Sequence, residues 1–382
     1  MKDLFMTFNA KKTALALACA LVTATSAFAQ TAPSVTLYGF LDLGLESNND
    51  GALTKTMLQN YSTRFGLKGE RSLSSDLTGM FQIETLVSPD DAKNQNTTTA
   101  LGSAPASGQL ASRNSFIGLK SNTLGTFMAG NYDTPFKSLN AGGLVNTLNG
   151  NGDALEIIMH GKAPTTGING KAGITLFGNV HTRQPNSFIY FSPKFSNIVV
   201  KALYSPDEGQ TATSNAPTYS LSAEWNDGTY NFGVATQNKA VSGTAIYAMS
   251  ANKVTMGAVM GSISGALAFT TLDNQATLAG NARKISNAMG TVNYTVAPWI
   301  FKVSYAQSSE SFSGANDGIT ETALEAQYNL DKATFMYVGY SQINNSANAK
   351  GSYAGGNADN SPAASAYGVT PSALTFGMRY VF

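Results

Sequence analysis

The sequence predicts an all-β protein, a sixteen-stranded antiparallel β-barrel that spans a membrane. Three observations lead to this prediction. Segments of about ten residues alternate apolar and polar side chains, and about ten is the length that a tilted membrane-spanning strand needs. Their connections alternate between short turns and long polar stretches. Beyond the N-terminus no segment is apolar for about 18 residues, and without spanning helices only a closed barrel satisfies its backbone polar groups in lipid.

The N-terminus predicts export. Lys11-Lys12 precede an apolar run, Thr13–Ser26, and then Ala27–Ala29 supplies an A-x-A cleavage motif. This order is that of a signal peptide, and its apolar run is too short to cross a bilayer. We expect residues 1–29 to be cleaved and residues 30–382 to form one barrel. The alternative, a buried N-terminal helix, is disfavoured because the cleavage motif stands where a signal peptidase requires it.

The composition excludes several functional classes. Lys and Arg total 24 and Asp and Glu total 23, so the chain has no basic excess for binding nucleic acid. The single cysteine, Cys19, lies in the predicted signal peptide, so the exported chain can form neither a disulfide nor a cysteine-based metal or redox site. The 37 glycines and many aromatic residues favour numerous strands and turns.

Alternation with a period of two supports the strands in order along the chain. It is clearest over residues 35–46, 63–70, 219–226, 321–330 and 374–382. The least regular stretch is Val241–Asn274, where we place two strands joined near Gly261–Gly265. Fourteen or eighteen strands remain alternatives to sixteen. A barrel of about sixteen strands leaves an aqueous lumen, whereas about eight strands would be filled by side chains.

The connections fall into two classes of length. The short ones span residues 72–76, 121–125, 192–197, 226–228, 296–298 and 330–332. The long ones span residues 46–62, 88–112, 133–185, 206–217, 308–318 and 343–371. Short turns on one rim and long loops on the other are typical of bacterial outer-membrane barrels, and a soluble β-sandwich has no reason to sort its loops in this way.

Several motifs resemble one family of proteins. Ser34–Gly39 resembles its opening strand, Thr63–Glu70 its S-R-F-G-L-K-G-E segment, and Arg113–Leu119 its R-x-A-[FY]-V-G-L strand. Asn186–Pro193 resembles its N-S-[IV]-x-Y-x-S-P strand, and Gly377–Phe382 its terminal strand ending in Phe. On these motifs the chain is similar to the trimeric general-diffusion porins of Gram-negative bacteria, in their Neisseria- and Burkholderia-type branch. The resemblance implies sixteen strands, a homotrimer and a third loop folded into the lumen.

The resemblance also implies a pore constriction. The third loop corresponds to Asp133–Pro185, and relatives place a row of arginines on the facing wall. Arg64 and Arg113 match two of these arginines by motif, and Arg183 corresponds to a third. Gly130-Asn131 stands where relatives usually have Gly-Arg, so one wall charge is missing, which argues against strong anion selectivity.

Acids on the loop would complete the constriction. Asp133, Asp153 and Glu156 are the candidates, and a narrow, charged constriction selects ions because the field is concentrated there. Lys137, Lys162 and Lys171 share the same loop and leave it near neutral. Solvated strand positions and structural ion pairs are the alternatives for the arginines. Arg113 shares its parity with Ile117 and Leu119, and we expect a loop packed against that wall to explain the apolar side chains on an inward face.

Aromatic residues suggest two further roles. Phe382 and Tyr380, at the end of an alternating strand, resemble the signal that the outer-membrane assembly machinery recognises. Interfacial girdles are expected from aromatic residues near strand ends, with ordinary strand packing as the alternative. The girdle candidates are Tyr38, Trp225, Tyr294, Trp299, Tyr328 and Tyr340.

Four functions compete on this pattern: a general-diffusion channel, a channel lined for one small anion or sugar, a barrel-embedded hydrolase and a soluble secreted β-protein such as an adhesin. The only histidines, His160 and His181, lie in the expected third loop, and no G-x-S-x-G elbow frames a nucleophile. We therefore expect no enzyme and no cofactor. The expected partners are small hydrophilic solutes and ions, outer-membrane lipid and lipopolysaccharide, the assembly machinery and further copies of the chain.

Overall fold

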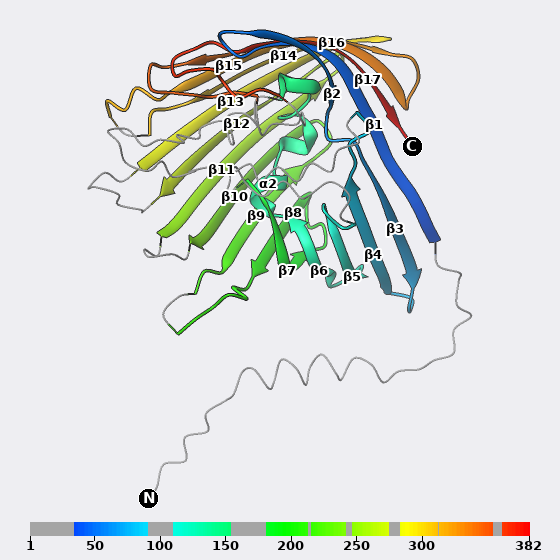
Figure 1. The fold of residues 1–382 in the computed structure, drawn as a ribbon. Coiled ribbons are helices and arrows are strands. Elements are labelled where there is room, and N and C mark those ends of the chain that lie inside the picture. The colour runs from blue at the N-terminus through cyan, green and yellow to red at the C-terminus, as the bar shows by residue number, and fades with distance from the viewer. Residues whose placement is uncertain are drawn as a thin grey trace, which may run out of the picture.

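The computed structural model describes residues 34–90, 110–153, 181–212, 215–241, 247–274, 283–311, 313–353 and 361–382. These residues form one closed antiparallel sheet (Figure 1). The first strand, β1 (Ser34–Asn49), pairs with the last, β17 (Ser372–Val381), and this pairing closes the barrel. Both β2 (Thr54–Asn60) and β3 (Arg64–Ser72) pair with β1, so together they act as one barrel strand interrupted at residues 61–63. The barrel therefore has the sixteen strands that the alternation predicts.

The remaining strands follow one another around the wall. They are β4 (Leu77–Leu86), β5 (Ser115–Ser121), β6 (Gly125–Asp133), β7 (Arg183–Phe191), β8 (Ile198–Ser205), β9 (Thr218–Asn226), β10 (Tyr230–Val241), β11 (Tyr247–Met260), β12 (Ile263–Asn274), β13 (Arg283–Val296), β14 (Trp299–Ser308), β15 (Ile319–Asn329) and β16 (Thr334–Asn345). The irregular stretch from residue 241 to 274 contains the two predicted strands, joined at residues 261–262.

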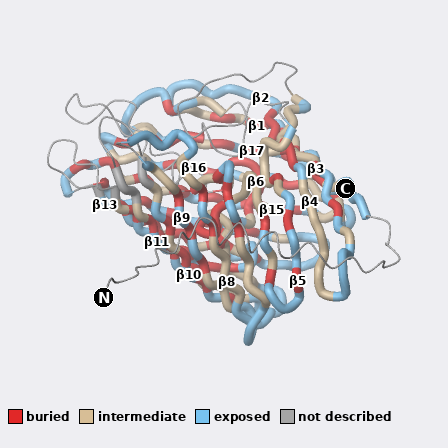
Figure 2. The backbone as a smooth tube through the Cα atoms, turned by 90° about the horizontal axis from the view of Figure 1, so that it is seen from below, coloured by how far each residue is buried: buried red, intermediate tan, exposed pale blue. Residues whose placement is uncertain are grey.

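Burial along the strands is the inverse of that in a soluble protein. On β14, Phe301 and Val303 are 45% and 47% exposed, whereas Lys302 is 6% exposed. The alternating colours of Figure 2 show the same period of two along the wall. Apolar side chains point outward and polar ones inward, as a barrel surrounded by lipid requires. Each large outward side chain gains roughly 1.5–3 kcal/mol on leaving water, so lipid stabilises this surface.

The first connection differs from its prediction. Residues 46–62 were expected to form a long loop, but β1 and β2 extend as a paired hairpin and leave only residues 50–53 between them. The Asp50 side chain accepts hydrogen bonds from the N–H groups of Ala52 and Leu53, which closes this turn. One face of the hairpin is buried, with Asn48 and Gln59 both 0% exposed, and the Asn48 amide donates to Glu46 over 2.8 Å.

The connection from β6 to β7 approaches the barrel wall. Its described part, residues 134–153, carries α2 (Pro135–Ser138), η1 (Ala141–Gly143) and η2 (Gly150–Gly152). Phe136, Leu139 and Val145 pack against small or apolar residues on the inward faces of β10 to β14. Figure 1 draws this segment between the walls of the barrel. No helix in the described ranges is long and apolar enough to cross a bilayer.

Candidate functional site

Four arginines gather on one side of the inner wall. Arg64 begins β3, Arg113 precedes β5, Arg183 begins β7, and Arg379 lies near the end of β17. The other three arginines are all close enough to Arg64 to act on its charge. Three of the four were predicted as site residues from motifs. Arg379 was not predicted, although it lies on the polar face of the alternating terminal strand, and the β1–β17 pairing brings it to the same wall.

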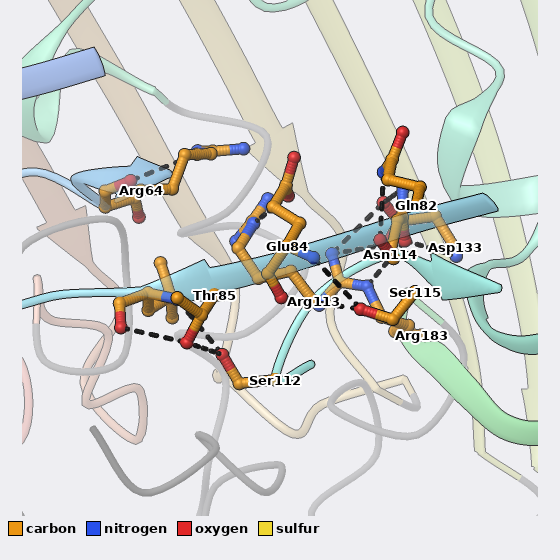
Figure 3. Close-up of polar contacts among 12 residues, drawn as sticks. Arg64, Gln82, Glu84, Thr85, Ser112, Arg113, Asn114, Ser115, Asp133 and Arg183 are labelled. Carbon is orange, nitrogen blue, oxygen red and sulfur yellow. Dashed lines mark hydrogen bonds and ion pairs between the residues drawn. The ribbon is translucent and has the colours of Figure 1, made fainter. Parts of the chain in front are cut away.

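Arg113 is paired with a carboxylate of the wall. Its Nε donates to Oε1 of Glu84 on β4 over 2.6 Å (Figure 3). The hydroxyl of Tyr38 on β1 donates to the other carboxylate oxygen over 3.0 Å. Tyr38 therefore faces the lumen, and its predicted place in an outer aromatic girdle is wrong. The alternation of β1 explains this, because Leu37 and Leu41 on the opposite parity are the exposed residues.

The parity argument for Arg113 is also corrected. Ile117 and Leu119 are 72% and 46% exposed and face outward, so they are not inward apolar side chains that a loop would cover. The strand begins at Ser115, after Arg113, and its alternation does not govern that residue. The irregular backbone before the strand lets the Arg113 side chain turn inward to Glu84.

Arg183 and Arg379 have their own carboxylates. Arg183 lies 3.0 Å from Asp133 and donates through Nε to Asn114 over 2.7 Å. Arg379 donates through Nε to Asp42 over 2.8 Å, and Asp42 is fully buried on β1. In these pairs charge-assisted hydrogen bonds hold each guanidinium in a fixed orientation, and most of its charge is neutralised locally.

Arg64 differs from the other three. Its Nε donates to the carbonyl oxygen of Ser62 over 3.1 Å, and its guanidinium lies 4.6 Å from the ring centre of Phe40. Figure 3 shows its side chain apart from the Glu84–Arg113 pair, with a single dashed contact. Within the described ranges no carboxylate forms an ion pair with Arg64, so its guanidinium has no acidic partner of its own.

The predicted acids are distributed unevenly. Asp133 lies with the arginines and also contacts Lys137, 3.4 Å away. Asp153 accepts a hydrogen bond from Asn146 over 2.6 Å and lies close enough to Glu321 on β15 to act on its charge. Glu156 lies outside the described residues. Of the two acids that lie in the described ranges, the structure therefore brings Asp133 to the arginine wall.

Two buried lysines fasten the segment 134–153 to the wall. Nζ of Lys253 on β11 donates to the carbonyl oxygens of Phe136 and Leu139, over 2.7 and 3.3 Å. Nζ of Lys302 on β14 donates to the carbonyl oxygen of Thr147 over 2.7 Å and forms an ion pair with Glu325 at 2.8 Å.

Acidic wall residues complete the attachment. Glu325 on β15 accepts a hydrogen bond from the amide side chain of Asn149 over 2.7 Å. Glu46 on β1 accepts one from Asn151, also over 2.7 Å. The wall thus donates to carbonyl groups of the segment near α2 and accepts from amide groups near η2. None of these tethering residues was predicted, because their partners lie more than a hundred residues away in the sequence.

The C-terminus lies at the closure of the barrel. The Phe382 N–H donates to the Gly39 carbonyl over 3.0 Å, and the Gly39 N–H donates back over 2.9 Å. The rings of Tyr380 and Phe382 are stacked, with centres 6.4 Å apart. A Cβ at Gly39 would lie 3.0 Å from the Phe382 ring and 2.3 Å from the Arg64 carbonyl oxygen, so only glycine fits.

The other aromatic candidates and His181 are also placed by the structure. Tyr294, Trp299, Tyr328 and Tyr340 are 37–49% exposed on the outer face, as the girdle prediction requires. Trp225 is less exposed, and its ring lies 5.8 Å from that of Phe232. His181 is buried just before β7, and His160 lies outside the described residues. Within the described ranges no group of three metal-ligating side chains is present.

The chain forms a closed antiparallel barrel with apolar side chains outside and charged side chains inside. Proteins of this class cross bacterial outer membranes and enclose a polar lumen. The chain belongs to the Gram-negative porin family, whose model matches residues 14–348. It is an outer-membrane diffusion channel. A comparison of the sequence with curated proteins finds no match.

Solved structures with the same fold include several porins. The anion-selective porin from Comamonas acidovorans is similar with a TM-score of 0.74 at 18% identity, over 92% of this chain and 100% of that one. OmpF of Salmonella typhi, in complex with daunomycin, has a TM-score of 0.65 at 15% identity over the same shares. OmpT of Vibrio cholerae in its trimer form has a TM-score of 0.65 at 14% identity, again over 92% and 100%.

Proposed function

We propose that this porin conducts small hydrophilic solutes passively and favours anions at a constriction between the arginine wall and the segment 134–153. Its wall side consists of Arg64, Arg113, Arg183 and Arg379. Asp133 lies on the wall side with Arg183, and the opposing side is formed by the connection that contains Asp153 and Glu156. The proposal rests on a difference in ion pairing between Arg64 and the other three arginines of the wall. Each of the other arginines pairs with a carboxylate, whereas Arg64 pairs with none in the described ranges.

The uncompensated guanidinium determines the sign of the local potential. A charge that lines a narrow aqueous passage acts on permeating ions more strongly than one in bulk water, because the walls exclude solvent. Each of the three ion pairs combines one positive and one negative charge, so the pairs add no net charge to the wall. The similarity to a porin described as anion-selective supports the same sign here. The missing arginine at Asn131 and the three pairs together favour a weak anion preference.

A salt gradient across a planar bilayer tests this assignment. Arg64→Ala and Arg113→Ala each remove one positive charge from the wall, so both should shift the zero-current potential toward cation preference. Arg71→Ala, on the outward face of β3, removes the same charge away from the lumen and serves as the matched control. Conductance without any shift in the two wall variants would show that the site residues are wrong. A folded protein that never conducts would overturn the channel itself.

We also propose that the chain assembles as a homotrimer in contact with outer-membrane lipid and lipopolysaccharide. A trimeric form is named for one neighbour of the same fold, and this supports the proposal. Cross-linking of the detergent-extracted protein should give a species of three chains. A product no larger than one chain would contradict the proposal.

Phe382 and Tyr380 are further proposed to form the signal for the assembly machinery. The backbone of Phe382 completes the closing strand pair through its two hydrogen bonds with Gly39, which makes the position of this residue independent of any loop. Phe382→Ala should lower the amount of barrel in the outer membrane while leaving refolding in detergent unchanged. Equal losses in both assays would assign Phe382 to barrel stability alone.

A further inference from the structure

An alternating stack of rings and guanidinium groups runs along the arginine side of the inner wall. The Arg379 guanidinium lies 5.5 Å from the ring centre of Phe335 and 4.6 Å from that of Phe40. Arg64 lies 4.6 Å from the same Phe40 ring. Phe335 pairs with Arg379, and Phe40 with Arg64, as opposite residues on neighbouring strands. The stack therefore crosses β16, β17, β1 and β3 without a break.

The two guanidinium groups of the stack differ in their hydrogen-bond partners. Arg379 is fixed by Asp42, which is itself held by the hydroxyl of Tyr337 over 2.9 Å. Arg64 is the terminal member, and only its Nε has a hydrogen-bond partner in the described ranges, the Ser62 carbonyl. Phe40 covers one face of the Arg64 guanidinium. No other ring and no carboxylate among the described residues contacts it, and the side chain is partly exposed.

An open guanidinium stacked on one ring suits a particular kind of solute. Its N–H edge can donate two parallel hydrogen bonds to a carboxylate, which is the geometry that arginine recognises best. Its uncovered face can accept a second aromatic ring, and such a contact contributes about 0.5–2 kcal/mol. A saturated carboxylate of the same charge and size gains only the first interaction.

We infer that the pore favours aromatic carboxylates over saturated carboxylates of equal charge, with Arg64 as the contact and Phe40 as the ring that positions it. This inference rests on the proposed function, because the solute must pass along the arginine wall. Aromatic carboxylates are then the preferred solute class of a passage that otherwise discriminates between solutes by their size and the sign of their charge.

Block of the chloride current in a planar bilayer tests the inference. Benzoate and cyclohexanecarboxylate carry one charge each and similar bulk, but only benzoate has a π face. Benzoate should halve the current at an about fivefold lower concentration than cyclohexanecarboxylate. Equal block by the two anions in a conducting channel would overturn the inference and leave the proposed function intact. Absence of any conductance would overturn both.

Two variants locate the preference. Arg64→Lys keeps the charge but loses the planar group, so it should retain conductance and lose the difference between the two blockers. Phe40→Leu should reduce the difference in the same direction. Phe116→Leu is the matched control, because its ring packs edge-to-face against Tyr132 outside the Arg64 stack. A blocker preference that survives Arg64→Lys would refute the role of the guanidinium face, whatever Phe40→Leu does to folding.

Discussion

At the scale of single residues, charge in the lumen is set pair by pair. Glu84 neutralises Arg113 and is itself held by the Tyr38 hydroxyl, so this wall carboxylate lowers the positive potential beside Arg64. Asp133 and Asp42 have the same effect on Arg183 and Arg379. The sequence motifs predict Arg64, Arg113, Arg183 and the acid Asp133, but not Glu84. Glu84 becomes a neighbour of Arg113 because β4 pairs with the chain before β5, where the Arg113 N–H donates to the Glu84 carbonyl over 2.9 Å.

Glu84→Gln should make the channel more anion-selective. The change removes one negative charge and frees the Arg113 guanidinium, while the amide can still accept the hydrogen bond from Tyr38. The zero-current potential in a salt gradient should move toward the anion limit by more than it does for Glu70→Gln, which removes an exposed acid near the end of β3. A potential unchanged from that of the parent protein would contradict the pairing account.

The alternation along the strands predicts the inward or outward side of more residues than the sequence analysis assigned from it. Tyr38 alternates with Leu37 and Gly39 on β1, and that pattern alone places it inward with Asp42 and Glu46. Arg379 alternates with Met378 in the same way. What could not be derived is the register of the closing β1–β17 pair, which sets Asp42 opposite Arg379 across more than three hundred residues of sequence.

At the scale of elements, the segment 134–153 depends on the wall for its position. Its helices are too short to be stable alone, since isolated helices shorter than about 12 residues are marginal in water. The hydrogen bonds from Lys253 and Lys302 and the packing of Phe136 and Leu139 replace that missing stability. The length of the connection and its approximate limits were readable from the sequence, but these contacts were not.

Lys253→Met should loosen this segment. Methionine fills much of the same space but leaves the Phe136 and Leu139 carbonyls without the ammonium donor, at a cost of about 1–3 kcal/mol. Single-channel records should show more current noise and more frequent partial closures than those of the parent. Lys284→Met, at an exposed position on β13, is the control and should be silent. Records as quiet as the parent's would contradict the tethering role.

Acid should weaken the turn between β15 and β16. The N–H groups of Ala333 and Thr334 donate to Asp331 and hold the pKa of its carboxyl below the usual 3.8. Because the pKa of this carboxyl is lower in the folded than in the unfolded protein, its ionised form stabilises the folded state. This stabilisation is present above about pH 4 and is lost as the pH falls through the folded-state pKa. Asp331→Asn should therefore flatten the pH dependence of thermal unfolding in this acidic range. A pH dependence of Asp331→Asn equal to that of the parent protein would contradict this role.

At the scale of the whole molecule, the fold was the most predictable feature. The period-two alternation gives the sixteen strands and the two classes of connection, because lipid outside and water inside impose opposite demands on successive residues. Strand β2 was hidden, since its residues 54–60 lie in a stretch that was interpreted as a long polar connection. The constriction was less predictable, because it depends on contacts between segments far apart in sequence.

The central claim is that the chain forms an open, water-filled passage with a constriction. Swelling of liposomes that contain the purified protein, in isotonic solutions of neutral sugars of increasing size, tests it most directly. Swelling rates should fall steadily with solute size and rise in proportion to solute concentration, because passage is diffusion without a saturable site for sugars. Absence of swelling with a correctly folded barrel, or a rate that saturates for one sugar alone, would contradict the account.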